Sequence, residues 1–163
     1  MSTFSVTVAY RPNESLVSQI QILVGLGMIP VVVFNSEYMG LLDQIHGIHI
    51  IKNIKNEGLA KAINLGVSYI LSKGGDGFFL FDQDSIPNLE MITNLLNLKQ
   101  KLSEEQIQFA SLGPMILNES DHSIWPVPVT SGGRLKFLRN LDKEIVEVDY
   151  LITSGIYIPA NVG

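Results

Sequence analysis

Two carboxylates directly follow a strongly apolar run in this 163-residue chain. Asp82 and Asp84 come after the run 78–81, with Gln83 between them. If this run is a buried strand that opens into a turn, both carboxylates can converge on one Mg²⁺ or Mn²⁺. These hard cations prefer oxygen ligands and commonly bridge protein carboxylates to substrate phosphates. The spacing therefore indicates a metal site, formed by Asp82 and Asp84, at which the ion neutralises charge on a departing diphosphate.

A structural role for the aspartates is the alternative. A helical pattern begins at Pro87 and extends to about Lys101. Asp84 or Ser85 could cap this helix, because short polar side chains accept hydrogen bonds from the first free N–H groups of a helix. An isolated Asp-x-Asp pattern does not separate the two interpretations, so other motifs must decide.

A second motif lies ahead of the aspartates, at 56–66, and reads Asn-Glu-Gly-Leu-Ala-Lys-Ala-Ile-Asn-Leu-Gly. Its alanines and glycines would let a helix pack closely on a sheet. Packing gives no reason, however, for asparagine at both Asn56 and Asn64. We therefore interpret the motif as part of a binding site, with Asn56 and Lys61 as candidate residues.

The elements that must position these residues follow an α/β order. Hydrophobic patterns predict strands at 5–10, 30–34, 48–51 and 78–81, and helices at 13–26, with Asn13 as N-cap, and at 56–73. Doubly wound sheets bind ligands at the carboxyl ends of their strands. Functional residues are thus expected at 9–12, 34–36 and 82–85.

The second half of the chain has weaker patterns. After the helix from Pro87, residues 109–112 are expected to form a further strand, and 145–153 show strand-like alternation. The segment 118–134 is polar and rich in glycine, proline and serine, which predicts a long loop.

Composition excludes several classes of function. The net charge is −5 without a basic cluster, which argues against a nucleic-acid partner. The chain has no cysteine, so thiolate metal sites and disulfides are excluded, as suits a cytoplasmic protein. Its longest nearly apolar stretch, 22–34, is shorter than the roughly 20 residues that span a bilayer. We expect no transmembrane segment, and leave open a peripheral attachment at the inner face of the cell membrane.

Four segments, in chain order, resemble the glycosyltransferases of family 2, and particularly their rhamnosyltransferase-like branch. They are 6–12, the motif 56–66, the strand end 82–85 and Thr153-Ser154-Gly155. The resemblance implies one Rossmann-like GT-A domain over 1–163, with a mostly parallel sheet and helices on both faces. It also implies a nucleoside-diphospho-sugar donor, Mg²⁺ or Mn²⁺, and transfer with inversion at the anomeric carbon.

The resemblance also suggests roles for single residues. Asp84 would bind the metal directly, and Asp82 would approach the ribose or a metal-bound water. Asn35 would face the Watson–Crick edge of the base; the family commonly has an acidic residue where this chain has Phe34. The donor site as a whole would comprise Ala9, Tyr10, Arg11 and Pro12 against the base, Asn56, Lys61 and Gln83, and Thr153, Ser154 and Gly155 beside the donor sugar.

The resemblance assigns no catalytic base. The end of the chain at 161–163 resembles the point just before the family segment that carries the base, so we expect a domain truncated at its acceptor side. Of the late acidic residues Asp142, Glu144, Glu147 and Asp149, the last comes nearest to Thr153 and is the candidate. A missing base would cost about 10²–10⁴-fold in rate.

The sequence therefore predicts a donor domain for dTDP-rhamnose or a UDP-sugar. The acceptor would be a saccharide or lipid-linked saccharide of a bacterial surface polysaccharide. One alternative is a truncated or degenerate module that binds the nucleotide sugar without turnover. Another is an unrelated α/β protein such as a receiver domain or a nucleotidyltransferase. For these, the chain lacks a second early acidic pair and a glycine-rich phosphate loop.

Overall fold

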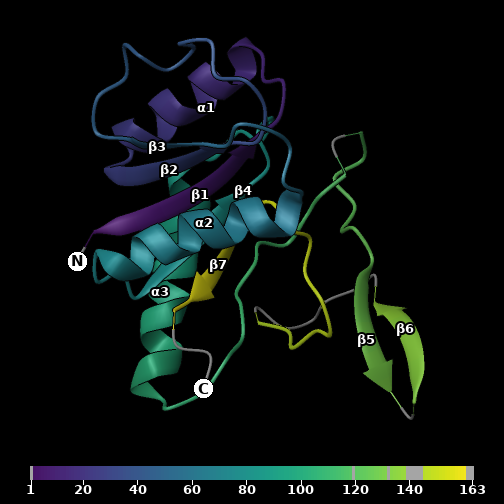
Figure 1. Ribbon diagram of the computed structural model, residues 1–163. Helices are drawn as coiled ribbons and strands as arrows, with labels where there is room; N and C mark the ends of the chain where they lie inside the picture. Colours follow the sequence, from purple (N-terminus) through teal and green to yellow (C-terminus); the bar gives the residue numbers. More distant parts are fainter. Residues whose placement is uncertain (1, 119, 132, 139–144, 161–163) are drawn as a thin grey trace.

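A five-stranded, mostly parallel sheet forms the centre of the molecule (Figure 1). The computed structural model describes residues 2–118, 120–131, 133–138 and 145–160. The strand order is β3-β2-β1-β4-β7. Parallel strands are β1 (Thr3–Ala9), β2 (Met28–Phe34), β3 (His49–Lys52) and β4 (Gly77–Phe81), and β7 (Ile156–Pro159) runs antiparallel to β4. The predicted α/β class is confirmed, and the arrangement is consistent with a Rossmann-like GT-A fold.

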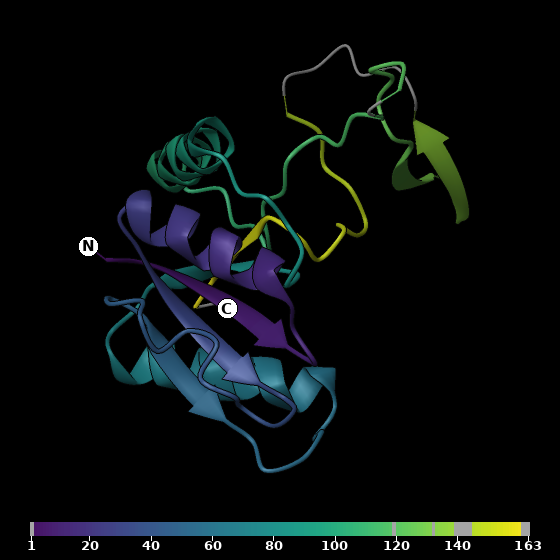
Figure 2. The same cartoon turned by 90° about the horizontal axis from the view of Figure 1, so that it is seen from above.

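Helices cover both faces of this sheet (Figure 2). Helices α1 (Glu14–Gly25) and α3 (Leu89–Glu104) pack on one face, where Leu16, Leu95 and Phe79 belong to one buried cluster. Helix α2 (Leu59–Ser72) covers the other face, with Ile70 against Val6 and Phe78. Because both faces are covered, β2 and β4 are apolar along nearly their whole length.

The predicted helix start agrees with the structure for α1, whereas α2 begins at Leu59, three residues after the predicted start at 56. The Asn13 side chain accepts a hydrogen bond from the Ser15 N–H at 3.0 Å and caps α1. Gly58, at φ 84°, provides the left-handed turn into α2 that favours glycine. In the part of the chain that the structure describes, no helix is long and apolar enough for a bilayer crossing.

Three predictions for the second half of the chain were wrong. Residues 109–112 form no strand apart from an isolated bridge between Leu112 and Tyr157. The expected loop 118–134 contains β5 (Val127–Ser131) and the start of β6 (Arg134–Leu138), a hairpin that lies away from the main sheet in both views. The alternating segment 145–153 is not a strand, because a strand needs a partner and the free edge of β4 pairs with Ile156–Pro159 instead.

Close packing of α2 on the sheet requires a missing side chain at Gly66. A Cβ atom there would lie 2.9 Å from Val6 Cγ1 and 3.3 Å from Val33 Cγ2. Ala62, one turn earlier, is fully buried. Ala62 and Gly66 thus have the packing role that the structural interpretation of the motif predicted, whereas Gly58 and Ala60 are exposed.

We expect Gly66→Ala to lower the free energy of unfolding by about 1–3 kcal/mol, since the added methyl overpacks the contact with β1 and β2. Gly25→Ala is the matched control, because a Cβ atom at Gly25 meets nothing within 4 Å. It should be neutral or stabilise by about 0.4–1 kcal/mol. Urea denaturation measures both, and equal effects of the two variants would contradict the packing argument.

Candidate functional site

The predicted site residues that follow β1, β2 and β4 lie at one edge of the sheet because parallel strands end on the same side. Tyr10 follows β1, Asn35 follows β2 and Asp82 follows β4. Since β7 is antiparallel, the residues before it lie at the same edge. The Gly155 N–H donates to the Leu80 carbonyl oxygen at 2.8 Å and brings this late loop beside the end of β4.

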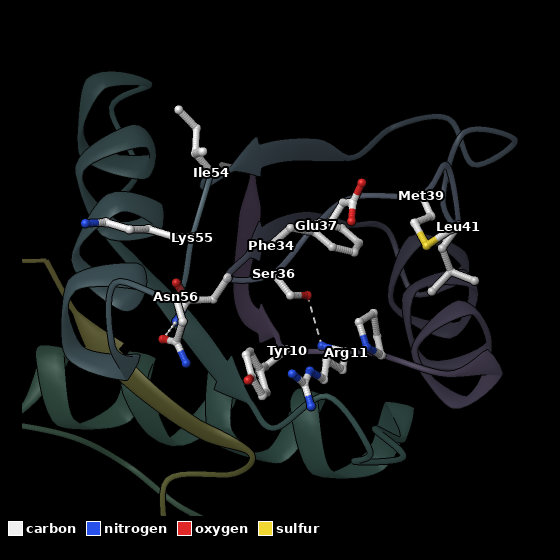
Figure 3. A pocket seen from close by; sticks show the side chains of 12 residues that line it. Tyr10, Arg11, Phe34, Ser36, Glu37, Met39, Leu41, Ile54, Lys55 and Asn56 are labelled. Carbon is white, nitrogen blue, oxygen red and sulfur yellow. Dashed lines mark hydrogen bonds between the residues drawn. The ribbon is translucent and has the colours of Figure 1, made fainter.

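A pocket of about 610 Å³ opens where β1, β2 and β3 end (Figure 3). The Arg11 N–H donates to Ser36 Oγ at 3.0 Å across this pocket and holds the loops after β1 and β2 together. Ala9 is fully buried and does not line the pocket. The lining residues are Tyr10, Arg11 and Pro12 after β1, Phe34, Asn35, Ser36, Glu37, Met39 and Leu41 after β2, and Ile54, Lys55 and Asn56 after β3.

Asn35 organises the wall of this pocket. Its side chain is 3% exposed, and its Oδ1 accepts hydrogen bonds from Asn53 Nδ2 at 3.1 Å and the Glu57 N–H at 2.9 Å. Its Nδ2 donates to Asn56 Oδ1 at 2.8 Å. Asn35 and Asn56 thus fix the loop between β3 and α2, and the recognition of a base by Asn35 stays a prediction.

Residues 82–85, the carboxylate turn, follow β4. The Ser85 N–H donates to the Asp82 carbonyl oxygen at 3.1 Å and closes the turn. Both aspartates are exposed. Partial burial raises the pKa of the Asp82 carboxyl, and the neighbouring Asp84 carboxylate adds to the rise. The turn therefore holds two negative charges that repel each other.

The capping alternative for the aspartates was wrong. Helix α3 begins at Leu89, two residues later than predicted, and its N-cap is Asn88. The Asn88 side chain accepts from the Met91 N–H at 2.8 Å. Neither Asp84 nor Ser85 is needed to start this helix.

Gln83 and Ser154 connect the carboxylate turn to its surroundings. Gln83 Oε1 accepts from the Tyr10 N–H at 2.9 Å, and its Nε2 donates to the Tyr10 carbonyl oxygen at 3.3 Å, as a paired strand would. Ser154 Oγ accepts from the Asp82 N–H at 3.4 Å and shares a hydrogen bond with Ser85 Oγ. Gln83 thereby joins the pocket to the turn.

Sequence reasoning missed Gln19, whose side chain also contacts this turn. Its Nε2 donates to the carbonyl oxygens of Asp82 and Ser85 at 2.6 and 2.9 Å. A signal existed in the sequence: position 19 falls three residues after Leu16 and four before Leu23, on the buried face of α1. A polar residue on such a face needs partners.

Other predicted residues do not line the first pocket. Lys61 is exposed and paired with Glu57 at 2.6 Å, and Thr153 is exposed. The Asp149 carboxylate accepts a hydrogen bond from the Thr130 N–H of the hairpin and lines a second pocket of about 330 Å³ with Glu147. Asp142 and Glu144 lie outside the described residues. Within the described ranges, no group of three histidine, aspartate or glutamate side chains could hold a metal by itself.

Comparison with known proteins finds sequence similarity to a sugar transferase. The chain is 32% identical over 128 residues to dTDP-rhamnosyl transferase RfbF of Shigella flexneri. The matched part is 76% of this chain but 42% of that protein, so the chain spans less than half of the relative's length. No protein-family model matches. The similarity supports a relationship to the glycosyltransferases.

We expect Asp82→Asn to raise the melting temperature at pH 7. The raised pKa of Asp82 means that the folded state disfavours its ionised form. This loss of stability is absent below the pKa of Asp82 in the unfolded chain, about 3.9, where the carboxyl is protonated in both states. It develops as the pH rises from there through the pKa of Asp82 in the folded state.

The gain should therefore vanish near pH 3.5, which differential scanning fluorimetry across pH can follow. Asp121→Asn is the control with the opposite sign, since hydrogen bonds from Ser123 lower the pKa of Asp121. A loss of stability in Asp82→Asn at pH 7 would show that this carboxylate stabilises the fold.

Proposed function

We propose that this chain is the donor-binding part of an inverting glycosyltransferase of family 2. It would bind a nucleoside-diphospho-sugar, dTDP-rhamnose or a UDP-sugar, together with Mg²⁺ or Mn²⁺. The observation that carries the proposal is the direct connection of a pocket to two exposed carboxylates through Gln83 and Tyr10. The name of the Shigella relative makes dTDP-rhamnose the first donor to test.

The pocket suits a nucleoside. Its volume falls within the roughly 300–1,000 Å³ typical of small-molecule sites. Tyr10, Met39 and Ile54 are exposed apolar side chains on its walls, which a planar base would cover. Arg11 adds positive charge that favours a phosphorylated ligand, whereas Lys55 is paired with Glu57 at 3.8 Å and Glu37 adds a negative charge to the lining.

The carboxylate turn suits a metal that the ligand helps to hold. Among the described residues, the Asp84 carboxylate has no hydrogen-bond or ion-pair partner. Two carboxylates are too few for a complete protein cage, but Mg²⁺ typically combines one or two carboxylates with waters and substrate phosphates. A bound metal would stabilise negative charge on the departing diphosphate. Asp84 is the proposed direct ligand, and Asp82 the proposed partner toward ribose or metal-bound water.

Transfer also requires removal of a proton from the acceptor hydroxyl. We propose a saccharide or lipid-linked saccharide as acceptor. Asp149 lies in the second pocket, where its carboxylate is already hydrogen-bonded to the hairpin. This position favours, as a second candidate function, a module that binds the donor without turnover.

Metal and nucleotide should bind interdependently. We expect dTDP to bind at least about tenfold more tightly with Mn²⁺ than with excess chelator, because the diphosphate supplies oxygens that Asp84 alone lacks. Asp84→Ala should abolish most of this difference, and Asp82→Ala should reduce it less. Isothermal titration calorimetry with dTDP and UDP measures each affinity.

Asp121→Ala, a carboxylate change in the segment before the hairpin, is the matched control and should keep the wild-type metal effect. Asp84→Ala should also not lower the melting temperature of the ligand-free protein, because it removes the repulsion with Asp82, whereas loss of a helix cap would cost about 1 kcal/mol. Equal affinity of the wild type for dTDP with and without chelator would overturn the metal-bridged proposal.

A further inference from the structure

An uncharged amide lies in the core directly beneath the carboxylate turn. Gln19, in the middle of α1, is 1% exposed and is surrounded by Leu16, Ile20 and Leu23, which are fully buried. Burying an amide without hydrogen bonds costs several kcal/mol, roughly 2–7. An apolar side chain at this position would be buried without that free-energy cost, so the hydrogen bonds of Gln19 need an explanation.

Both N–H groups of the Gln19 amide are directed at the carboxylate turn. Nε2 donates to the Asp82 carbonyl oxygen at 2.6 Å and to the Ser85 carbonyl oxygen at 2.9 Å. These carbonyls belong to the first and last residues of the turn. Gln19 Oε1 accepts a longer hydrogen bond, 3.4 Å, from Thr7 Oγ1 of β1. One amide therefore fixes the two ends of the turn relative to each other and to the central strand.

The turn needs such an anchor because the charges of its two aspartates destabilise its ordered conformation. Two exposed carboxylates two positions apart repel each other, and each turn residue loses conformational freedom when it is ordered. The other anchors, Gln83 to Tyr10 and Ser154 to Ser85, come from loop residues that are exposed or half-buried. Only the contacts of Gln19 come from the core among those that the structure describes.

We propose that Gln19 is a positioning residue for the metal and the donor diphosphate. It acts through the backbone of the carboxylate turn and would hold Asp84, the proposed metal ligand, in place before a metal and a diphosphate bind. The inference rests on the proposed function. It adds a residue that contacts neither ligand and yet sets the metal dependence of nucleotide binding, because a turn ordered beforehand lowers the entropic cost of binding.

Gln19→Met tests this role, since methionine has a similar shape but no N–H donor. We expect the affinity for dTDP in the presence of Mn²⁺ to fall by about tenfold or more. The variant loses the one or two hydrogen bonds that order the turn before binding, and a loss of that size corresponds to about a factor of ten in affinity. The affinity measured in excess chelator should stay within about twofold, because Gln19 does not line the pocket. Thr7→Val, which removes only the long bond to Oε1, should keep both affinities near the wild-type values.

A merely structural role would lower stability without changing the ratio of the two affinities. Gly66→Ala controls for this, because it destabilises the opposite face of the sheet without contact to the turn. All affinities are compared well below the lowest melting temperature. Amide hydrogen exchange of residues 82–85 in the ligand-free protein should accelerate in Gln19→Met and stay unchanged in Gly66→Ala.

Should Gln19→Met fail to fold, Gln19→Asn keeps an amide that reaches at most one carbonyl and should give an intermediate loss of about threefold. An unchanged affinity ratio with unchanged exchange at 82–85 overturns the proposal and leaves the proposed function standing. A wild-type protein whose nucleotide binding ignores Mn²⁺ overturns both.

Discussion

The position of β1 between β2 and β4, parallel to both, is the constraint on which the site depends. Ala9 pairs with Phe34, and Thr7 pairs with Phe81, so the three strands end close to the same level. The residues that follow them, Tyr10, Asn35 and Asp82, then share one edge. Burial of the strands on both faces stabilises this register, because a shift would move apolar side chains out of the two cores.

Beyond the strand ends at this edge, hydrogen bonds of side-chain amides connect the loops, where the backbone pairing of the sheet has stopped. Asn35 joins the loop after β2 to the loop before α2, Gln83 joins the carboxylate turn to β1, and Gln19 joins the same turn to α1. An amide both donates and accepts hydrogen bonds but carries no charge, so it can be buried beneath a loop and still hold the loop by hydrogen bonds. The exposed charges of Arg11, Asp82 and Asp84 remain accessible to a ligand.

Amides that order the loops and charges that stay accessible together support the view of the chain as a binding platform, formed by the pocket and the carboxylate turn. The pocket and the carboxylate turn are neighbours with different chemistry; the first is the proposed site for a base and the second the proposed site for a metal and phosphates. The hairpin β5–β6 and Asp149 lie apart from that platform, and Asp149 is occupied by a backbone hydrogen bond. The proposed donor half of the reaction thus has a physical basis in the described residues, and the acceptor half has none among them.

The sequence by itself determined the elements whose signals are local. Apolar runs and helical periodicity predicted β1 to β4 and all three helices, Asn13 predicted the start of α1, and the position of Asp82 and Asp84 at a strand end followed from the run before them. Tertiary structure alone decided the edge pairing of β7, the hairpin, and the partners of the buried amides. Gln19 donates to the carbonyl oxygens of Asp82 and Ser85, which lie 63 and 66 positions further along the chain. Strand pairing and the hydrogen bonds of a buried amide depend on which distant segments the fold brings within about 3 Å, and no local pattern encodes that distance.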